Sequence, residues 1–321
     1  MITWYCLDGE VPTPIPPLET GSPEETASTR WVHLTNPTEE ERNHISARYR
    51  IPMDHLRAAL DERERPRMEY DAPVLLVIAR IPVQTAVQDD NTLHTPFRTL
   101  SAAIILTPEV VVTVCLKKDV IESMITRKMR GPVKSTGPRF LLNLLFSIST
   151  IFINHLRDLD QAVVDIEVAL QKSMHNNELI RMLHIEKSLI YFLTALRGNH
   201  TVMEKLASTP GLMQTAEERE FLNDVMIENK QAADMAQIYT EIMGSIGDTF
   251  GAIVSNNLNK VMKLLAGLAI VFMIPGTIGA LYGMNVPLPF QDNRLAFAGL
   301  CLLCILLSFL GYRILRKLEW I

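Results

Sequence analysis

Two long apolar stretches near the end of the chain, separated by a short loop, constrain its fold more than any other feature. Residues 261–282 contain a single charged residue, Lys263, and residues 295–314 contain only Arg313. Each stretch approaches the roughly 20 apolar residues that a helix needs to cross a bilayer. The connection at 286–294 is too short for anything but a hairpin return. The sequence therefore predicts a two-helix transmembrane domain at 261–321.

Composition predicts that a polar domain precedes these spans. The chain is 48% hydrophobic and still carries 21% charged residues, a mixture that suggests a polar domain joined to a membrane part. The net charge of −5 comes without a large basic patch, so nucleic acid is not an expected partner. Cys301 and Cys304 form a C-x-x-C inside an apolar run, which favours membrane packing over metal or redox chemistry.

The distribution of positive charge predicts the orientation in the membrane. Basic residues flank both outer ends of the two spans, whereas the connecting loop has only Arg294. The flanking residues are Lys260, Lys263, Arg313, Arg316 and Lys317. Since cytoplasmic segments carry the excess of Lys and Arg, both termini are expected in the cytoplasm. No signal peptide is recognisable at the N-terminus, and we expect a multi-pass protein of the plasma (inner) membrane.

Residues 1–135 have the pattern of a cytoplasmic α/β domain. Strands are expected at 31–34, 74–81, 100–106 and 110–116, the last two as a hairpin across 107–109. Asn36 is expected as an N-cap, with Pro37 at the first helical position and Glu39 three residues after the cap. Because the chain has no Gly-rich phosphate loop, nucleophile elbow or HExxH motif, it is not expected to be an enzyme.

Residues 136–260 are expected to form a helical hairpin and a stalk helix. Apolar residues recur by threes and fours from 141 to 170, which predicts a helix with a heptad-like seam. A second helix is expected to about residue 207. Thr215 and Glu218 form a capping box, and from 216 to 282 only Pro275 interrupts the helical pattern. A continuous helix over that range would be on the order of 100 Å long.

One face of this last helix changes character along its length. Steps of seven from Asp234 meet acidic residues first, then small, polar and apolar ones: Glu241, Asp248, Ser255, Met262, Ala269, Gly276 and Gly283. One interpretation is a funnel that collects cations and narrows to an apolar gate. The other is a solvated acidic face followed by a small-residue helix contact. Because two helices cannot enclose a polar path in lipid, conduction would require several copies.

The tripeptide between the spans carries a resemblance to a known family. Tyr282-Gly283-Met284-Asn285, together with residues 255–263 and the basic-aromatic tail at 316–321, closely resembles the CorA family of magnesium channels over essentially the full chain. The resemblance implies an α+β membrane protein: an N-terminal cytoplasmic α/β domain, a long helical stalk and two C-terminal transmembrane helices. It also implies a funnel-shaped homopentamer whose partners are further copies, the bilayer and hydrated divalent cations.

The same resemblance implies roles for individual residues. Gly283, Met284 and Asn285 would form the selectivity filter that receives hydrated Mg²⁺, because this ion dehydrates reluctantly. The first span would line the pore, at positions that partly coincide with the series of residues seven apart that begins at Asp234. These are Asn259, Met262, Leu265, Met273, Gly276, Thr277 and Ala280.

Regulation is implied in the same way. In the family, divalent ions between neighbouring cytoplasmic domains hold the channel closed. Two of the matching acidic positions are Asp224 and Asp248, and a partner carboxylate from the α/β domain is assigned to Asp89 or Asp90. For each of these residues a solvated surface charge is the alternative interpretation.

The expected function is Mg²⁺ influx, driven by the membrane potential and gated by intracellular Mg²⁺. The chain departs from the family pattern at Pro275-Gly276-Thr277, one residue closer to Gly283 than usual, and in the neutral sequence at 286–289. Transport of Co²⁺, Ni²⁺ or Zn²⁺ is the nearest alternative. A membrane-anchored oligomeric metal sensor is an alternative of a different class.

Overall fold

The structure is a computed structural model that describes residues 1–7, 12–15, 30–85, 95–117, 137–172, 176–286, 295–318 and 320. It separates into two compact units, Met1–Gly244 and Ser245–Ile321. The boundary between the units falls within one helix, α6 (Ala216–Tyr282). The functional division at residues 135 and 260 remains a prediction.

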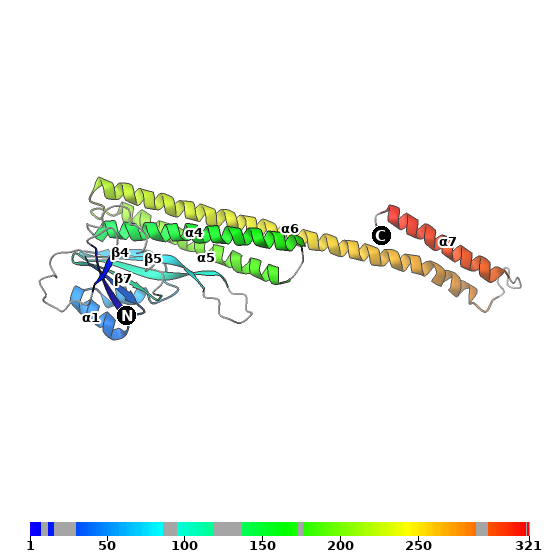
Figure 1. The fold of residues 1–321 in the computed structure, drawn as a ribbon, viewed down its shortest axis with the longest axis horizontal. Coiled ribbons are helices and arrows are strands. Elements are labelled where there is room, and N and C mark those ends of the chain that lie inside the picture. The colour runs from blue at the N-terminus through cyan, green and yellow to red at the C-terminus, as the bar shows by residue number, and fades with distance from the viewer. Residues whose placement is uncertain are drawn as a thin grey trace. The chain divides into compact units, whose positions relative to one another are not determined.

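A seven-stranded mixed sheet occupies the first unit (Figure 1). The strands are β1 (Ile2–Cys6), β2 (Thr13–Ile15), β3 (Arg30–Thr35), β4 (Arg67–Asp71), β5 (Val74–Gln84), β6 (Phe97–Leu106) and β7 (Val110–Cys115). Their order is β2-β1-β3-β7-β6-β5-β4. Only the β3–β7 pair is parallel among the pairings of the described strands.

The predicted strands are confirmed as β3, β5, β6 and β7. The hairpin between β6 and β7 turns at Thr107, whose N–H donates to the Val110 carbonyl (3.0 Å) and whose Oγ1 accepts from Val110 N (3.0 Å). β7 reads Val-Val-Val-Thr-Val-Cys and is buried throughout, as expected of β-branched residues in a strand covered on both faces. β1, β2 and β4 were not predicted.

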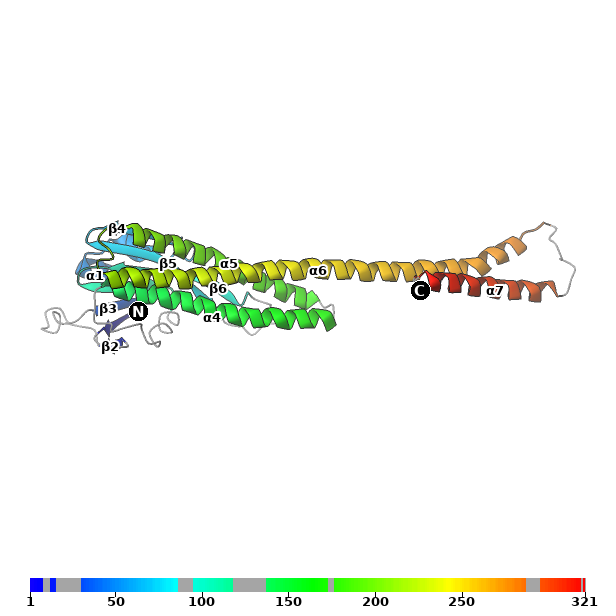
Figure 2. The same cartoon turned by 90° about the horizontal axis from the view of Figure 1, so that it is seen from above.

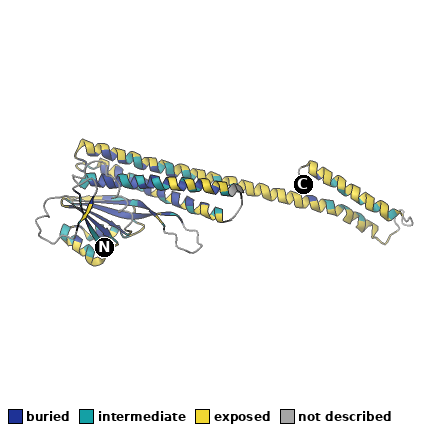
Figure 3. Ribbon diagram, viewed as in Figure 1, coloured by how far each residue is buried: buried dark blue, intermediate teal, exposed yellow. Residues whose placement is uncertain are grey.

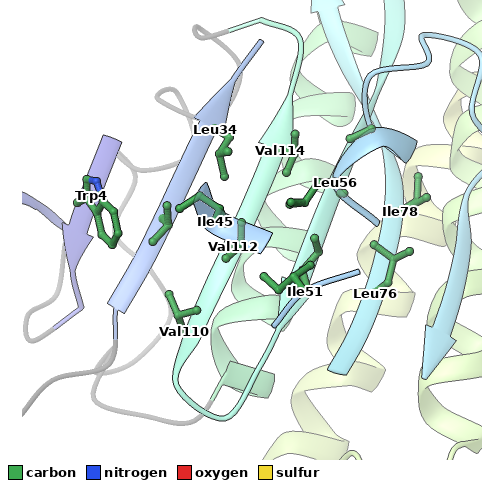
Figure 4. Close-up of a cluster of buried hydrophobic side chains, with 14 residues drawn as sticks. Trp4, Leu34, Ile45, Ile51, Leu56, Leu76, Ile78, Val110, Val112 and Val114 are labelled. Atoms are coloured by element: carbon green, nitrogen blue, oxygen red, sulfur yellow. The ribbon is translucent and has the colours of Figure 1, made fainter. Parts of the chain in front are cut away.

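The two faces of the sheet pack against different helices. On one face, Leu34, Val112 and other strand residues form a buried cluster with Ile45 and Leu56, which belong to α1 (Glu39–Tyr49) and α2 (Met53–Ala58) (Figure 4). On the other face, Trp31 lies 5.2 Å between ring centroids from Phe140 of α4 (Gly137–Lys172). Alternate residues of β3 therefore serve opposite layers.

The predicted start of α1 was wrong by two residues. Thr38, not Asn36, is the N-cap: its side chain accepts from Glu41 N, and Glu41 Oε2 accepts from Thr38 N at 2.9 Å. Asn36 instead has φ 41°, in the left-handed region and unlike the extended backbone of an N-cap. Three successive glutamates made the register of the capping box ambiguous in the sequence.

The three predicted long helices are present, and two of them, α4 and α5 (Asn176–Ser208), contact the far face of the sheet. Both lie beside the first part of α6 in the two views (Figures 1 and 2). The ring contact of Phe146 with Phe221 (6.1 Å) joins α4 to α6. The hydrogen bond from Asn229 Nδ2 to the Leu196 carbonyl (3.0 Å) joins α5 to α6. The predicted capping box at Thr215 and Glu218 is confirmed.

The second unit contains the remainder of α6 and α7 (Ala296–Lys317). Nearly all of its residues are exposed (Figure 3). Among the described residues, α4, α6 and α7 contain windows long and apolar enough to cross a membrane. The window of α4 is 67% buried inside the protein, whereas those of α6 and α7 are only 6% buried. α4 is thus a core helix, and α6 and α7 are the membrane-spanning candidates.

Candidate functional site

The tripeptide Gly283-Met284-Asn285 ends α6 in an exposed turn. Gly283 N donates to the Gly279 carbonyl at 2.9 Å, and Met284 N then reaches back only three residues, to the Leu281 carbonyl at 3.4 Å. A Cβ on Gly283 would lie 3.3 Å from the Gly279 carbonyl oxygen, so glycine suits this close approach. All three residues are exposed, which leaves carbonyl and carboxamide oxygens available to a hydrated cation.

The loop that follows lies mostly outside the described residues. Val286 is described and 49% exposed, whereas 287–294 are not. The predicted neutral loop therefore stays a sequence observation beyond Val286.

The predicted pore-lining residues are all exposed on α6. They are Asn259, Met262, Leu265, Met273, Gly276, Thr277 and Ala280. At about 100° per residue, Met262, Met273 and Ala280 lie within a narrow arc of the helix. A Cβ added to Gly276 would meet no atom within 4 Å. This face is therefore uncovered in a single chain.

A different face of α6 packs on α7. Gly267 is buried, and Val271, Ile274 and Ile278 are partly buried, whereas most of their neighbours are exposed. Their spacing of three and four residues defines one stripe. A Cβ on Gly311 of α7 would lie 3.3 Å from Ile274 Cδ1. The stripe of Gly267, Val271, Ile274 and Ile278 lies about 100° or more around α6 from the arc of Met262, Met273 and Ala280, so α7 leaves that arc open.

The two described carboxylates that are predicted to be regulatory lie about 36 Å apart along α6. Asp224 and Asp248 are exposed residues of α6, and they belong to different units. Asp89 and Asp90 lie outside the described residues. Within the described part of the chain, no group of three or more His, Cys, Asp or Glu side chains could hold a metal ion. Asp234 and Glu241, the acidic end of the series of residues seven apart, are also exposed.

The four cysteines are free thiols. Cys301 is exposed on α7 and Cys304 is partly buried. In the first unit, burial raises the pKa of the Cys115 thiol to about 12, so this side chain holds its proton at neutral pH.

Sequence analysis missed a basic and aromatic hollow at the end of α7. Its lining residues are Phe309, Tyr312, Arg313, Ile314, Arg316 and Lys317. From the sequence, these cations indicated the orientation of the spans, and the tail at 316–321 contributed to the family resemblance. Their i, i+3 and i, i+4 spacing was the signal that they share a face.

Comparison with known proteins connects these features to one family. A family model described as "CorA-like Mg2+ transporter protein" matches residues 26–317. The cobalt/magnesium transport protein CorA of Methanocaldococcus jannaschii is 27% identical over 297 residues, 91% of this chain and 91% of that protein. The protein of the same name from Thermotoga maritima is 22% identical over 231 residues, 70% of this chain and 64% of that protein.

A solved structure matches the whole fold. The complete structure of the CorA magnesium transporter from Methanocaldococcus jannaschii has a TM-score of 0.82 at 23% identity and covers 100% of this chain and 99% of that one. The α/β domain, long helices and two apolar C-terminal helices therefore follow a known arrangement.

Proposed function

Because this chain belongs to the family of CorA-like Mg²⁺ transporter proteins, we propose that it conducts Mg²⁺ into the cell through a pore bordered by Gly283, Met284 and Asn285. The chain is a divalent cation transporter, as its family is. The observation that carries the specific proposal is the exposed tripeptide at the end of α6, placed between two apolar helices. The chain acts in transport and not as an enzyme.

Several copies must assemble to form the path. The apolar windows of α6 and α7 are only 6% buried within one chain, and two helices cannot enclose a polar path in lipid. The face of α6 with Met262, Met273 and Ala280 is uncovered by α7, so it is available to line a central pore. By the family resemblance we propose a homopentamer with a funnel-shaped cytoplasmic part.

The filter works by contacting the waters of the ion. Mg²⁺ holds its first hydration shell tightly. A ring of Asn285 carboxamides and Gly283 carbonyls offers acceptors to those waters without replacing them. The remaining pore positions, Asn259, Leu265, Gly276 and Thr277, present polar or small groups beside apolar ones, which suits a narrow passage that can also close.

The membrane potential supplies the driving force. A divalent cation that moves inward across 100 mV gains roughly 4.6 kcal/mol, twice the value for a single charge. No coupled chemical reaction is needed. The positive residues that flank the two spans favour a cytoplasmic position for both termini, and the proposed location of the spans is the plasma (inner) membrane.

Intracellular Mg²⁺ closes the pore in this proposal. Asp224 and Asp248, which lie 24 residues apart on α6, would hold separate regulatory ions. Asp89 or Asp90 of a neighbouring copy would supply a partner carboxylate, since carboxylate oxygens are the ligands Mg²⁺ prefers. The bound ions would screen repulsion between carboxylates of neighbouring copies, and their loss would let the cytoplasmic domains separate. Exposure of Asp224 and Asp248 leaves both accessible to such an ion.

Flux through reconstituted protein tests the proposal. In liposomes with an inside-negative potential and a Mg²⁺ indicator, we expect Mg²⁺ entry for the wild type. For Asn285→Ala we expect entry to fall by about tenfold, equivalent to about 1.4 kcal/mol. Asn177→Ala, a change of the same kind at an exposed position of α5, should leave flux unchanged. Equal flux in the wild type and Asn285→Ala would contradict the assignment of the filter.

The alternatives give different results in the same liposomes. Both curated relatives are named for cobalt as well as magnesium, so Co²⁺ is the first competing cargo, followed by Ni²⁺ and Zn²⁺. Competition of each metal against Mg²⁺ flux ranks them. A membrane-anchored sensor would pass no ion at any potential.

A further inference from the structure

We propose that the C-terminal end of α7 binds the phosphate headgroup of an anionic phospholipid through Arg313, Arg316 and Lys317. This inference rests on the proposal that α7 crosses a membrane, and it requires none of the ion chemistry of the pore.

The three cations line a hollow of suitable size. Its volume is about 560 Å³, within the range of roughly 300–1,000 Å³ typical of small-molecule sites. Phe309 and Tyr312 form its apolar side. The hollow thus combines an apolar part, as a lipid chain requires, with a cationic part, as a phosphate requires.

The position of the cations on the helix directs them away from the protein. Cys304, Ser308, Gly311 and Leu315 form the least exposed stripe of α7, which packs toward α6 through Gly311. Arg313 lies about 180° around the helix from the centre of that stripe. Arg316 and Lys317 lie within about 60° of Arg313, and all three are exposed. In a membrane, this face meets lipid.

The cations have no negative partner within the described chain. Among the described residues, no carboxylate forms an ion pair with Arg313, Arg316 or Lys317. The Arg313 guanidinium instead lies 5.9 Å from the Phe309 ring centroid. This contact favours an extended arginine along the helix surface. The three positive charges on one lipid-facing surface therefore favour the binding of an anion from outside the protein.

The depth of the site matches the headgroup region. The cations occupy the last turns of an apolar helix, where the hydrocarbon core ends. Trp320 stays at this end, because its backbone N–H donates to the Leu315 carbonyl (3.0 Å), and tryptophan favours the membrane interface. Arginine binds phosphate oxygens in a bidentate manner. Cations at this depth attract the anionic lipids of the cytoplasmic leaflet.

Trp320 provides a selective probe of the site. The chain has three tryptophans, of which Trp4 and Trp31 are 5% and 0% exposed in the sheet domain. Brominated acyl chains therefore quench Trp320 and not the other two. With full-length protein in phosphatidylcholine vesicles, we expect brominated phosphatidylglycerol to bind on the order of tenfold more strongly than brominated phosphatidylcholine.

The triple variant Arg313→Gln, Arg316→Gln, Lys317→Gln should lose this preference. Its quenching by brominated phosphatidylcholine alone should match the wild type, because the span remains inserted. The matched control Arg50→Gln, Arg63→Gln, Arg98→Gln removes three exposed positive charges from the sheet domain and should keep the preference. Arg313→Lys, Arg316→Lys retains charge and should keep most of it.

Three results would overturn the proposal. They are equal binding of the two lipids by the wild type, an unchanged preference in the triple variant, and displacement of the lipid by millimolar inorganic phosphate, which would indicate a free-anion site. A change in oligomer mass without a change in lipid preference would instead assign the cations to carboxylates of another copy. Ion flux is measured independently in the same vesicles. A preference for the anionic lipid without ion flux would contradict the proposed pore function but not the proposed lipid site.

Discussion

The side chain of Asn199 completes the hydrogen bonding of the sheet edge. β4 pairs with β5 only as far as Arg67 opposite Ile78, so the backbone of Arg80 has no strand on that side. Asn199 of α5 fills the gap: its Oδ1 accepts from Arg80 N and its Nδ2 donates to the Arg80 carbonyl, both at 2.8 Å. A carboxamide has the donor and acceptor that a strand would offer. Gly198 allows the approach, because a Cβ there would lie 2.7 Å from Pro66 Cγ.

Replacing Asn199 by alanine should destabilise the sheet domain. Asn199 is 1% exposed, so the change leaves two backbone groups unsatisfied in the interior, at a cost of about 2–4 kcal/mol. We expect a lower thermal midpoint for the full-length protein in detergent and faster hydrogen exchange at Arg80. Asn223→Ala, at an exposed position of α6, should change neither. A similar loss of stability in both variants would show that the hydrogen bonds between Asn199 and the Arg80 backbone make no specific contribution to stability.

At the scale of the element, α6 has two faces with different roles. The stripe of Gly267, Val271, Ile274 and Ile278 packs toward α7, and the face containing Met262 and Met273 remains open. In one chain the open face is indistinguishable from lipid-facing surface by exposure: Met273 is 65% exposed, and Ile305 of α7 is 66% exposed. Assembly around a water-filled path would expose Met273 to water and leave Ile305 exposed to lipid.

Cysteine accessibility tests this difference. In a chain with Cys6, Cys301 and Cys304 replaced by serine, Cys115 remains unreactive, because burial raises its pKa to about 12. We expect a charged, water-soluble thiol reagent to modify Met273→Cys and block flux. Ile305→Cys should react at least about tenfold more slowly, because thiolate formation is unfavourable in lipid. Equal rates at the two positions would contradict a pore on this face of α6.

At the scale of the whole molecule, regulation depends on ligands from more than one copy in our proposal. Asp224 and Asp248 lie 24 residues apart on α6, and a partner carboxylate would come from the sheet domain of a neighbour. A divalent ion at such a site stabilises the closed assembly by mass action, to the extent that it binds this state preferentially. Any such coupling is measurable as a dependence of conformation on Mg²⁺ concentration.

The double variant Asp224→Asn, Asp248→Asn should weaken closure by Mg²⁺. For the wild type we expect Mg²⁺ to slow proteolysis and reduce flux. For the variant we expect the midpoint to move about tenfold higher in Mg²⁺, equivalent to about 1.4 kcal/mol. Asp54→Asn, Glu109→Gln neutralises two exposed carboxylates elsewhere and should leave the midpoint in place. An unshifted midpoint in the first variant would assign Asp224 and Asp248 to solvated surface charge.

Local patterns predicted much of the fold. The capping box of Thr215 and Glu218 predicted the start of α6. Runs of β-branched residues predicted β5 and β7. Both signals depend only on residues that are close together in the sequence. The β-branched and aromatic residues of β1 (Ile2–Cys6) are a strand signal that was overlooked, whereas β4 (Arg67–Asp71) was missed because it is short and mostly polar. Their pairing partners make them strands. The parallel contact of β3 with β7 was equally hidden, since these strands are far apart in the sequence.

The sequence by itself determined the two spans, the tripeptide between them and the resemblance to a transporter family, because apolar length and a contiguous motif are local properties. Only the tertiary structure decided which helix surfaces are buried: the apolar window of α4 is 67% buried under the protein's own side chains, whereas those of α6 and α7 are 6% buried. It also decided which face of α6 packs on α7 and which remains open. Those outcomes depend on contacts between distant segments, and no local pattern encodes them.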